Sequence, residues 1–169
     1  GLNRGVLGNV LEAKMRLNQS ERDRLYNAKV NPIATFPQTG VCIWGQKTLQ
    51  ERSTALDRIN VRRLLIAVKK YIASSSRYLV FEQNTQATRN RFLNIVNPYL
   101  ESVQQRQGLY AFRVQMDESN NTPDVIDRNQ LVGAIYLQPT KTAEFIVLDF
   151  NVLPTGATFD GGGSGGGGY

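Results

Sequence analysis

Residues 59–79 read INVRRLLIAVKKYIASSSRYL, and their apolar side chains recur three or four positions apart. At about 100° per residue, side chains with this spacing share one side of an α-helix. The apolar set is Val61, Leu64, Leu65, Val68, Ile72 and Leu79. The other side carries four cations, which are Arg62, Arg63, Lys69 and Lys70. The pattern predicts an amphipathic helix with its apolar side in a protein core and its basic side on the surface.

A second helix is predicted downstream, beginning after Thr85 as the N-cap and ending at Gly108. Its apolar side consists of Phe92, Val96, Leu100 and Val103. Pro98 lies inside this stretch and predicts a kink or a break, because proline has no amide donor and crowds the preceding turn.

Four stretches have the pattern of β-strands. A short buried strand is predicted at residues 41–44, and residues 109–116 alternate, with Tyr110, Phe112, Val114 and Met116 on the apolar face. Residues 131–137 are apolar on both faces, which predicts a central strand. Residues 144–153 form the last strand, with Ile146, Leu148, Phe150 and Val152 on one face.

This order of elements predicts an α+β fold, a mixed β-sheet with two main helices packed on one face and extended N- and C-terminal arms. The residues expected to be buried together are Leu65, Val68, Ile72, Phe92, Val96, Phe112, Ile135 and Leu148.

The chain divides into three expected parts. Residues 1–39 form an N-terminal arm or linker, in which Ser20 and Glu21 cap a short helix. Residues 40–153 form the core domain, and residues 154–169 form a C-terminal arm with a glycine-rich tail. Both ends, residues 1–8 and 160–169, are expected to be poorly ordered in an isolated chain.

Composition excludes several classes of protein. The longest apolar runs, residues 64–68 and 145–148, are far shorter than the ~20 residues of a membrane-spanning helix. One cysteine rules out a disulfide framework or a thiolate metal cluster. The absence of histidine removes the commonest general base and metal ligand. We therefore expect no enzyme, no cofactor, no metal site and no membrane insertion.

Three possible catalytic features have simpler interpretations. Residues 40–48, GVCIWGQKT, resemble a phosphate-binding loop, but Gln46 separates the second glycine from the lysine, so a strand and a turn are favoured. Cys42 has no histidine to activate it, which favours a buried structural thiol. The acidic residues Asp117, Glu118, Asp124 and Asp127 flank the loop segment NNTP, which indicates a solvated turn. We expect no catalytic residue.

Charge is unevenly distributed along the chain. The net charge is +6, but residues 61–113 contain nine basic and two acidic residues, whereas residues 114–169 contain two basic and seven acidic residues. A basic segment is compatible with nucleic acid, and opposite charges on two segments are equally compatible with self-association. The basic side of the first helix lacks the aromatic residues that nucleic-acid readers interleave with charge, which favours a protein partner.

Four segments resemble the contractile-tail sheath proteins. They are WGQKTL (44–49), RINVRRL (58–64), FEQN (81–84) and, after Pro139, AEFI (143–146). The resemblance spans roughly residues 40–153, and the order and spacing of these segments are similar to those in the C-terminal core of that family.

The resemblance implies a non-enzymatic structural subunit of the virion, assembled in the host cytoplasm. Such subunits form a homo-oligomeric helical sheath of hexameric rings around a tail tube, and contraction drives the tube through the host envelope. It also implies that the chain lacks the outward domains of a complete sheath protein. We expect Arg62, Arg63, Lys69 and Lys70 to contact the tube or another acidic surface, and no nucleic acid. The inter-subunit strand is expected to use Phe145, Val147, Asp149, Asn151, Leu153 and Thr155. A basic nucleic-acid-binding module is the alternative.

Overall fold

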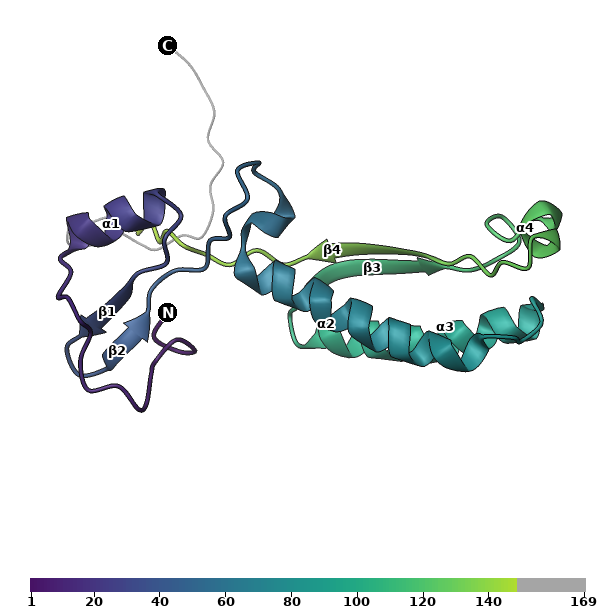
Figure 1. The fold of residues 1–169 in the computed structure, drawn as a ribbon, viewed down its shortest axis with the longest axis horizontal. Helices are drawn as coiled ribbons and strands as arrows, with labels where there is room; N and C mark the ends of the chain where they lie inside the picture. Colours follow the sequence, from purple (N-terminus) through teal and green to yellow (C-terminus); the bar gives the residue numbers. More distant parts are fainter. Residues whose placement is uncertain (149–169) are drawn as a thin grey trace, which may run out of the picture.

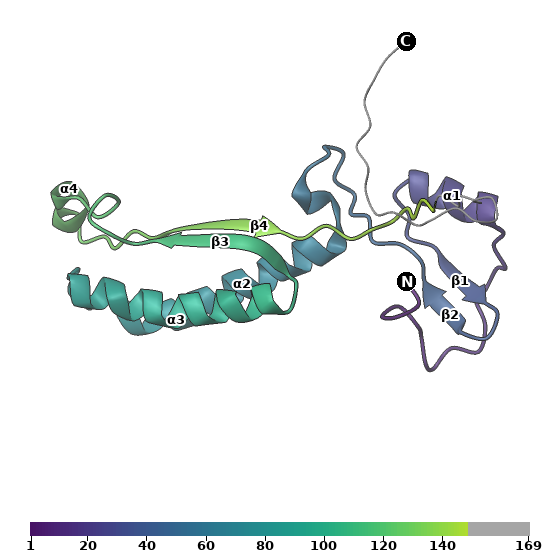
Figure 2. The same cartoon turned by 180° about the vertical axis from the view of Figure 1, so that it is seen from behind.

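The computed structural model describes residues 1–148, which form an elongated molecule with two parts (Figure 1). The helices are α1 (Gln19–Asn27), α2 (Ile59–Ser76), α3 (Gln86–Gln105) and α4 (Pro123–Asp127). The strands are β1 (Ile33–Phe36), β2 (Gly40–Ile43), β3 (Leu109–Gln115) and β4 (Ala134–Pro139). Two 3-10 turns flank α2, η1 (Ala55–Asp57) and η2 (Arg77–Leu79). The smaller part contains α1, β1 and β2, and the larger part contains the β3–β4 hairpin and the two long helices (Figure 2).

Both long helices form where their periodicity predicts them. In α3 the Thr85 hydroxyl accepts a hydrogen bond from the Thr88 amide at 3.3 Å, which confirms the predicted N-cap. Of the kink or break predicted at Pro98, the break does not occur, because α3 is continuous through this residue. Because Pro98 has no amide hydrogen, the carbonyl of Asn94 lacks its helical hydrogen bond. Both residues are exposed, so a water molecule can donate a hydrogen bond to this carbonyl instead.

The first helix, α1, has a different cap from the expected one. Asn18 is the N-cap: its side chain accepts a hydrogen bond from the Glu21 amide at 2.9 Å, and the Glu21 carboxylate accepts one from the Asn18 amide at 2.8 Å. This reciprocal capping box needs an acceptor three residues before the glutamate, a position that Asn18 has and Ser20 does not.

The α+β class and the two main helices are confirmed, while the strands differ from the predicted mixed sheet. Within residues 1–148 they form two separate antiparallel pairs, β1 with β2 and β3 with β4. Residues 131–137, predicted to be a central strand, contribute to β4 of a hairpin, and Tyr136 on this strand is 57% exposed. The apolar run was misleading because the hairpin has only one covered face.

A β-bulge changes which side chains of β3 are buried. The pairing passes from Leu109 opposite Pro139 to Ala111 opposite Gln138, which leaves Tyr110 as the extra residue. Beyond such an irregularity the alternation of faces is reversed. Leu109 is therefore buried and Tyr110 is 61% exposed, so the predicted apolar face is wrong at its first position.

The core lies between the hairpin and the two long helices. Its buried side chains are Val68, Leu79, Phe92, Val96, Leu100, Val103, Leu109 and Met116. Val68, Phe92 and Val96 are confirmed members, and Ile72, Phe112 and Ile135 pack against them half-buried. Two expected members are outside it, since Leu64 packs on the core in place of Leu65, and Leu148 is 68% exposed.

The two chain ends also differ from expectation where the structure describes them. Residues 1–8 were expected to be poorly ordered, but Leu7 donates a backbone hydrogen bond to Val41 at 2.9 Å, beside β2. Residues 144–148, predicted as the start of a strand, have no strand partner here. The remainder of that predicted strand, residues 149–153, and the glycine-rich tail lie outside the described residues. No helix within residues 1–148 has the length and apolar character needed to cross a membrane.

Candidate assembly surfaces

The basic side of α2 is fully on the surface. Arg62, Arg63, Lys69 and Lys70 are all exposed, and at 100° per residue they lie within an arc of about 120°. Ile66 lies inside this arc and is 56% exposed. The structure thus brings the four predicted residues together around one apolar side chain. We call these five residues the α2 basic face.

The composition of the α2 basic face suits binding to an acidic protein surface. Among the described residues its cations make no ion pair, so their charge is available. An exposed apolar residue surrounded by cations contributes burial on association, while the charges provide attraction and orientation.

A second feature fixes the chain after β4 to the start of α2. The Glu144 carboxylate accepts hydrogen bonds from Arg58, at 2.6 Å from Nε and at 3.1 Å from the terminal amino nitrogen. Arg58 is the residue before α2, and Asp57 lies 3.3 Å from its other amino nitrogen. This two-point contact, the Arg58–Glu144 clamp, fixes position and orientation because both groups are planar.

Neighbouring side chains join the clamp to the smaller part of the molecule. Lys47 donates to the carbonyl of Tyr26 at 2.9 Å, with its ammonium 3.9 Å from the centre of the Tyr26 ring. The side chain of Gln46 donates to the Thr142 hydroxyl. Three stretches distant in sequence therefore meet at one place, those around residues 26, 47 and 144.

The acid–base properties of this cluster follow from its contacts. Burial acts to raise the pKa of Glu144, but hydrogen bonds from Arg58 and Tyr26 outweigh it, and the pKa is lowered. The hydrogen bond to Glu144 raises the pKa of Arg58. Burial, together with the adjacent Glu144 carboxylate, raises the pKa of Tyr26 to about 12. At neutral pH the clamp is thus a full ion pair.

Directly after the clamp the chain is apolar and belongs to no helix or strand. Phe145 is 85% exposed, Ile146 80%, Val147 83% and Leu148 68%. Phe145 and Val147, predicted for the inter-subunit strand, are free on the surface. The other predicted members, Asp149, Asn151, Leu153 and Thr155, lie outside the described residues. Four consecutive exposed apolar side chains are typical of a segment that another molecule covers.

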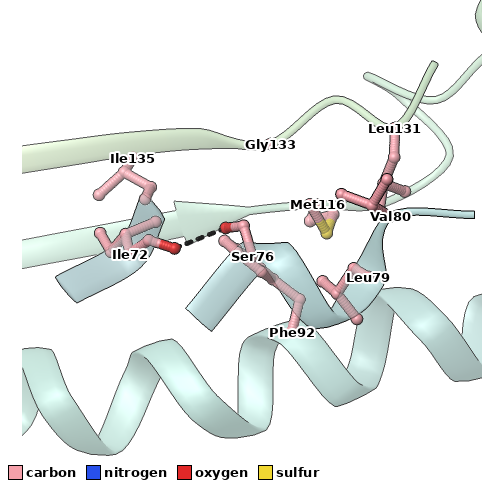
Figure 3. Close-up of a pocket in the computed structure, with 9 residues that line it drawn as sticks. All are labelled: Ile72, Ser76, Leu79, Val80, Phe92, Met116, Leu131, Gly133 and Ile135. Carbon is pink, nitrogen blue, oxygen red and sulfur yellow. Dashed lines mark hydrogen bonds between the residues drawn. The ribbon is translucent and has the colours of Figure 1, made fainter. Parts of the chain in front are cut away.

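An apolar hollow with a volume of about 360 Å³ lies between the end of α2, the start of α3 and the hairpin (Figure 3). Its lining residues are Ile72, Ser76, Leu79, Val80, Phe92, Met116, Leu131, Gly133 and Ile135. The Ser76 hydroxyl is already used, donating to the Ile72 carbonyl at 2.7 Å. A hollow without charged or free polar groups lacks the means for acid–base or nucleophilic chemistry.

The features that resembled catalytic motifs have structural roles. Residues 40–43 of the phosphate-loop-like stretch form β2, and Cys42 is completely buried, which confirms the strand and the structural thiol. Asp117 is exposed in a turn, and hydrogen bonds from Ser119 lower its pKa. Among residues 1–148 no three potential ligand side chains gather into a metal site.

Sequence reasoning missed the clamp and its surroundings. Arg58, Lys47 and Glu144 lay within the segments that carried the family resemblance, but none was given a role. The clamp joins residues 86 positions apart, and no local spacing rule reports such a pair.

The described part of the chain thus has two exposed surfaces of the kind that bind other proteins, the α2 basic face and the apolar segment at residues 145–148. Residues 51–153 match the family described as the phage tail sheath C-terminal domain. That match covers more than half of the 169 residues, including α2, α3 and the hairpin. The chain belongs to the phage tail sheath family.

Curated relatives agree with this assignment. The chain is 41% identical to the tail sheath protein of Enterobacteria phage T4 over 160 residues, which is 95% of this chain and 24% of that protein. It is 41% identical to the tail sheath protein of Vibrio phage KVP40 over 159 residues, 94% of this chain and 24% of that protein. This chain spans about a quarter of the length of these relatives.

Solved structures share the fold. A chain from the baseplate of the anti-feeding prophage is similar with a TM-score of 0.77 and 25% identity, covering 87% of this chain and 43% of that one. The sheath complex of an extracellular contractile injection system, in its contracted state, is similar with a TM-score of 0.76 and 29% identity. That alignment covers 85% of this chain and 44% of the sheath chain.

Proposed function

We propose that this chain is the assembly core of a contractile tail sheath in a virion. In this proposal, copies form a helical sheath of stacked hexameric rings around a tail tube, and contraction drives the tube through the host envelope. The chain provides contacts and no enzymatic chemistry. Support comes from its family and from its similarity to a sheath complex in a contracted state.

The observation that carries the proposal is the apolar segment that leaves the Arg58–Glu144 clamp. The clamp fixes where the segment starts, and the apolar side chains of Phe145 and Val147 that follow it are exposed to solvent. An extended chain can add to the edge of another sheet through its backbone groups, with alternate side chains giving specificity. We propose that residues 145–155 link one subunit to the next in this way.

A pair of truncations tests the linkage. Removal of residues 154–169 from the full chain should leave the monomer folded, because the core is built from residues 68–116. It should abolish sheath polymers in electron micrographs, since the linking strand loses its end. The control lacks only residues 161–169, the glycine-rich tail, and should polymerise normally. Polymers of normal length from the larger truncation would refute the linkage.

We propose the α2 basic face as the surface that contacts the tail tube. Its four cations and Ile66 are exposed, and complementary charge would orient a tube with an acidic surface. Contraction would then be a change between two packings of the same subunits, with energy stored in their contacts.

Charge reversal separates this contact from folding. Lys69→Glu with Lys70→Glu should reduce assembly on tubes at low salt by tenfold or more, about 1.4 kcal/mol, while the melting temperature changes little. A control with the same charge change elsewhere is Arg91→Glu with Arg113→Glu, both exposed and outside α2. Equal assembly by the two double variants would exclude the α2 basic face as the tube contact. Strong salt-dependent binding of random DNA would instead favour the nucleic-acid alternative.

A further inference from the structure

One end of the larger part carries exposed apolar side chains from two loops. The turn between α2 and α3 and the loop around α4 lie at the same end of the molecule in both views (Figure 1, Figure 2). Asn84 joins the two loops, because its side chain donates to the Gln130 carbonyl at 2.9 Å and to the Asn121 side chain at 3.1 Å. We call the exposed apolar residues of these loops the apolar tip, which consists of Tyr78, Val80, Phe81, Ile126 and Val132.

Phe81 is the most exposed residue of the apolar tip, and its backbone is strained. Its φ angle is 70°, in the left-handed region that bulky residues rarely adopt, and its side chain is 102% exposed. The turn is held in place, because the Glu82 amide donates to the Leu79 carbonyl at 3.2 Å and the Leu79 side chain is buried in the core. Strained residues that the surrounding structure holds in place are concentrated at functional sites. Since aromatic side chains are enriched in the cores of protein interfaces, Phe81 has the properties of an interface anchor.

The apolar hollow described above lies next to Phe81. Val80, the preceding residue, lines the hollow, and it lies together with Leu131 at one end (Figure 3). An apolar cavity of about 150 Å³ is large enough to bind benzene, so a hollow of about 360 Å³ accommodates a phenyl ring. The Phe81 ring of the same chain is fully exposed and does not enter it. One end of the molecule thus presents both an exposed ring and a hollow of sufficient size for such a ring.

We propose that two copies of the chain pair through their apolar tips, with the Phe81 ring of each copy in the hollow of the other. The occupant is a second copy because one tip carries both complementary features. Two identical tips related by a two-fold axis satisfy each other, and the contact closes as a dimer. This pairing uses neither the α2 basic face nor residues 145–155.

The exposed area at the apolar tip predicts a weak dimer. A buried aromatic side chain covers about 150–250 Å², so Tyr78 and Phe81 of both copies remove about 600–1,000 Å² from water. Stable specific interfaces bury about 1,200–2,000 Å². The expected dissociation constant is therefore on the order of 0.1 mM. Because a two-fold dimer cannot extend, the pair has to dissociate before its subunits join an assembly through head-to-tail contacts.

Sedimentation velocity of the full chain over a concentration series tests the pairing, because it separates monomer, dimer and polymer in one run. Phe81→Ala should weaken the dimer at least tenfold, since both ring insertions are lost, and it should fold normally because the changed side chain is exposed. Phe145→Ala is the matched control. It changes the same residue type at 85% exposure, beside the Arg58–Glu144 clamp, and should dimerise like the unaltered chain.

Three results of the concentration series would overturn the pairing. They are a chain that stays monomeric up to about 1 mM, ten times the expected dissociation constant, a dimer that Phe81→Ala leaves unchanged, and a dimer that Phe145→Ala weakens as strongly as Phe81→Ala does. The last result would place the contact in the segment after the clamp.

A change in the hollow tests where the ring goes. A Cβ atom at Gly133 would lie 2.9 Å from the Met116 methyl carbon and 3.8 Å from the Phe92 ring, so Gly133→Val displaces Met116 and narrows the hollow. This variant should also weaken the dimer at least tenfold, and urea unfolding verifies its fold. Gly133→Ala, which adds only the Cβ atom, replaces it should the valine variant not fold.

Mixing the two variants gives the decisive result. The copy with Gly133→Val keeps its Phe81 ring, and the copy with Phe81→Ala keeps its hollow, so a mixed pair regains one of the two insertions. The mixture should therefore contain more dimer than either variant alone at the same total concentration. No gain on mixing would overturn the insertion of Phe81 into the hollow.

Discussion

Breaking the Arg58–Glu144 clamp tests how the exposed apolar segment is positioned. We consider Glu144→Gln, Arg58→Gln and the double variant, which together form a thermodynamic cycle. Arg58 also contacts Asp57 at 3.3 Å, and the cycle cancels that contribution because it is lost in both variants that lack the arginine.

The expected coupling follows from geometry and exposure. A hydrogen bond to a charged group contributes about 1.5–3 kcal/mol, whereas a fully exposed ion pair contributes about 0–1 kcal/mol. The Arg58 and Glu144 side chains are 30% and 17% exposed, with a bond of 2.6 Å between them. Solvent screening at this exposure reduces the bidentate pair to a coupling of about 1–2 kcal/mol.

Urea unfolding at pH 7 measures the coupling as the difference in free energy of unfolding around the cycle. Its pH dependence has a defined sign, because the pKa of Glu144 is lower in the folded chain than the ~4.3 of an unfolded one. The clamp's contribution is complete above about pH 5 and disappears as the pH falls through the lowered pKa. A control cycle pairs Arg58→Gln with Glu101→Gln, an exposed residue on α3, and should give no coupling. Equal values from the two cycles would refute the clamp.

The remaining predictions concern the core and the surfaces. Leu100 is fully buried, so Leu100→Ala should lower the free energy of unfolding by about 2–5 kcal/mol. Leu65 lies outside the main core, so Leu65→Ala should lower it by less than about 2 kcal/mol. Urea unfolding compares the two variants, and a larger loss at Leu65 would contradict the core assignment. Reversal of charge at Lys69 and Lys70 should affect assembly on tubes and leave the urea midpoint unchanged.

The sequence by itself determined the parts that depend on neighbours three or four residues away. The apolar and basic sides of α2, the cap at Thr85 and a strand at residues 41–44 all follow from local spacing. The structure contains each of them, with the strand one residue earlier, at Gly40–Ile43. The exposure of the four cations on α2 belongs to the same group, because one side of a helix that buries the other must face outward.

Only the tertiary structure decided which distant segments meet. The bulge at Tyr110 depends on how β3 aligns with β4. Because of this bulge, Tyr110 does not lie on the buried face that the alternation of apolar residues predicts. The Arg58–Glu144 clamp and the bridge between Val6 and Cys42 close loops of 86 and about 36 residues, and the choice among possible partners depends on how the whole chain packs. An exposed apolar segment such as residues 145–148 has the same local sequence pattern whether its partner is in the same chain or in another. The periodicity of apolar residues shows which face of a helix or strand a residue lies on. Which strand pairs with it depends on the packing of the whole chain, and no local sequence pattern contains that information.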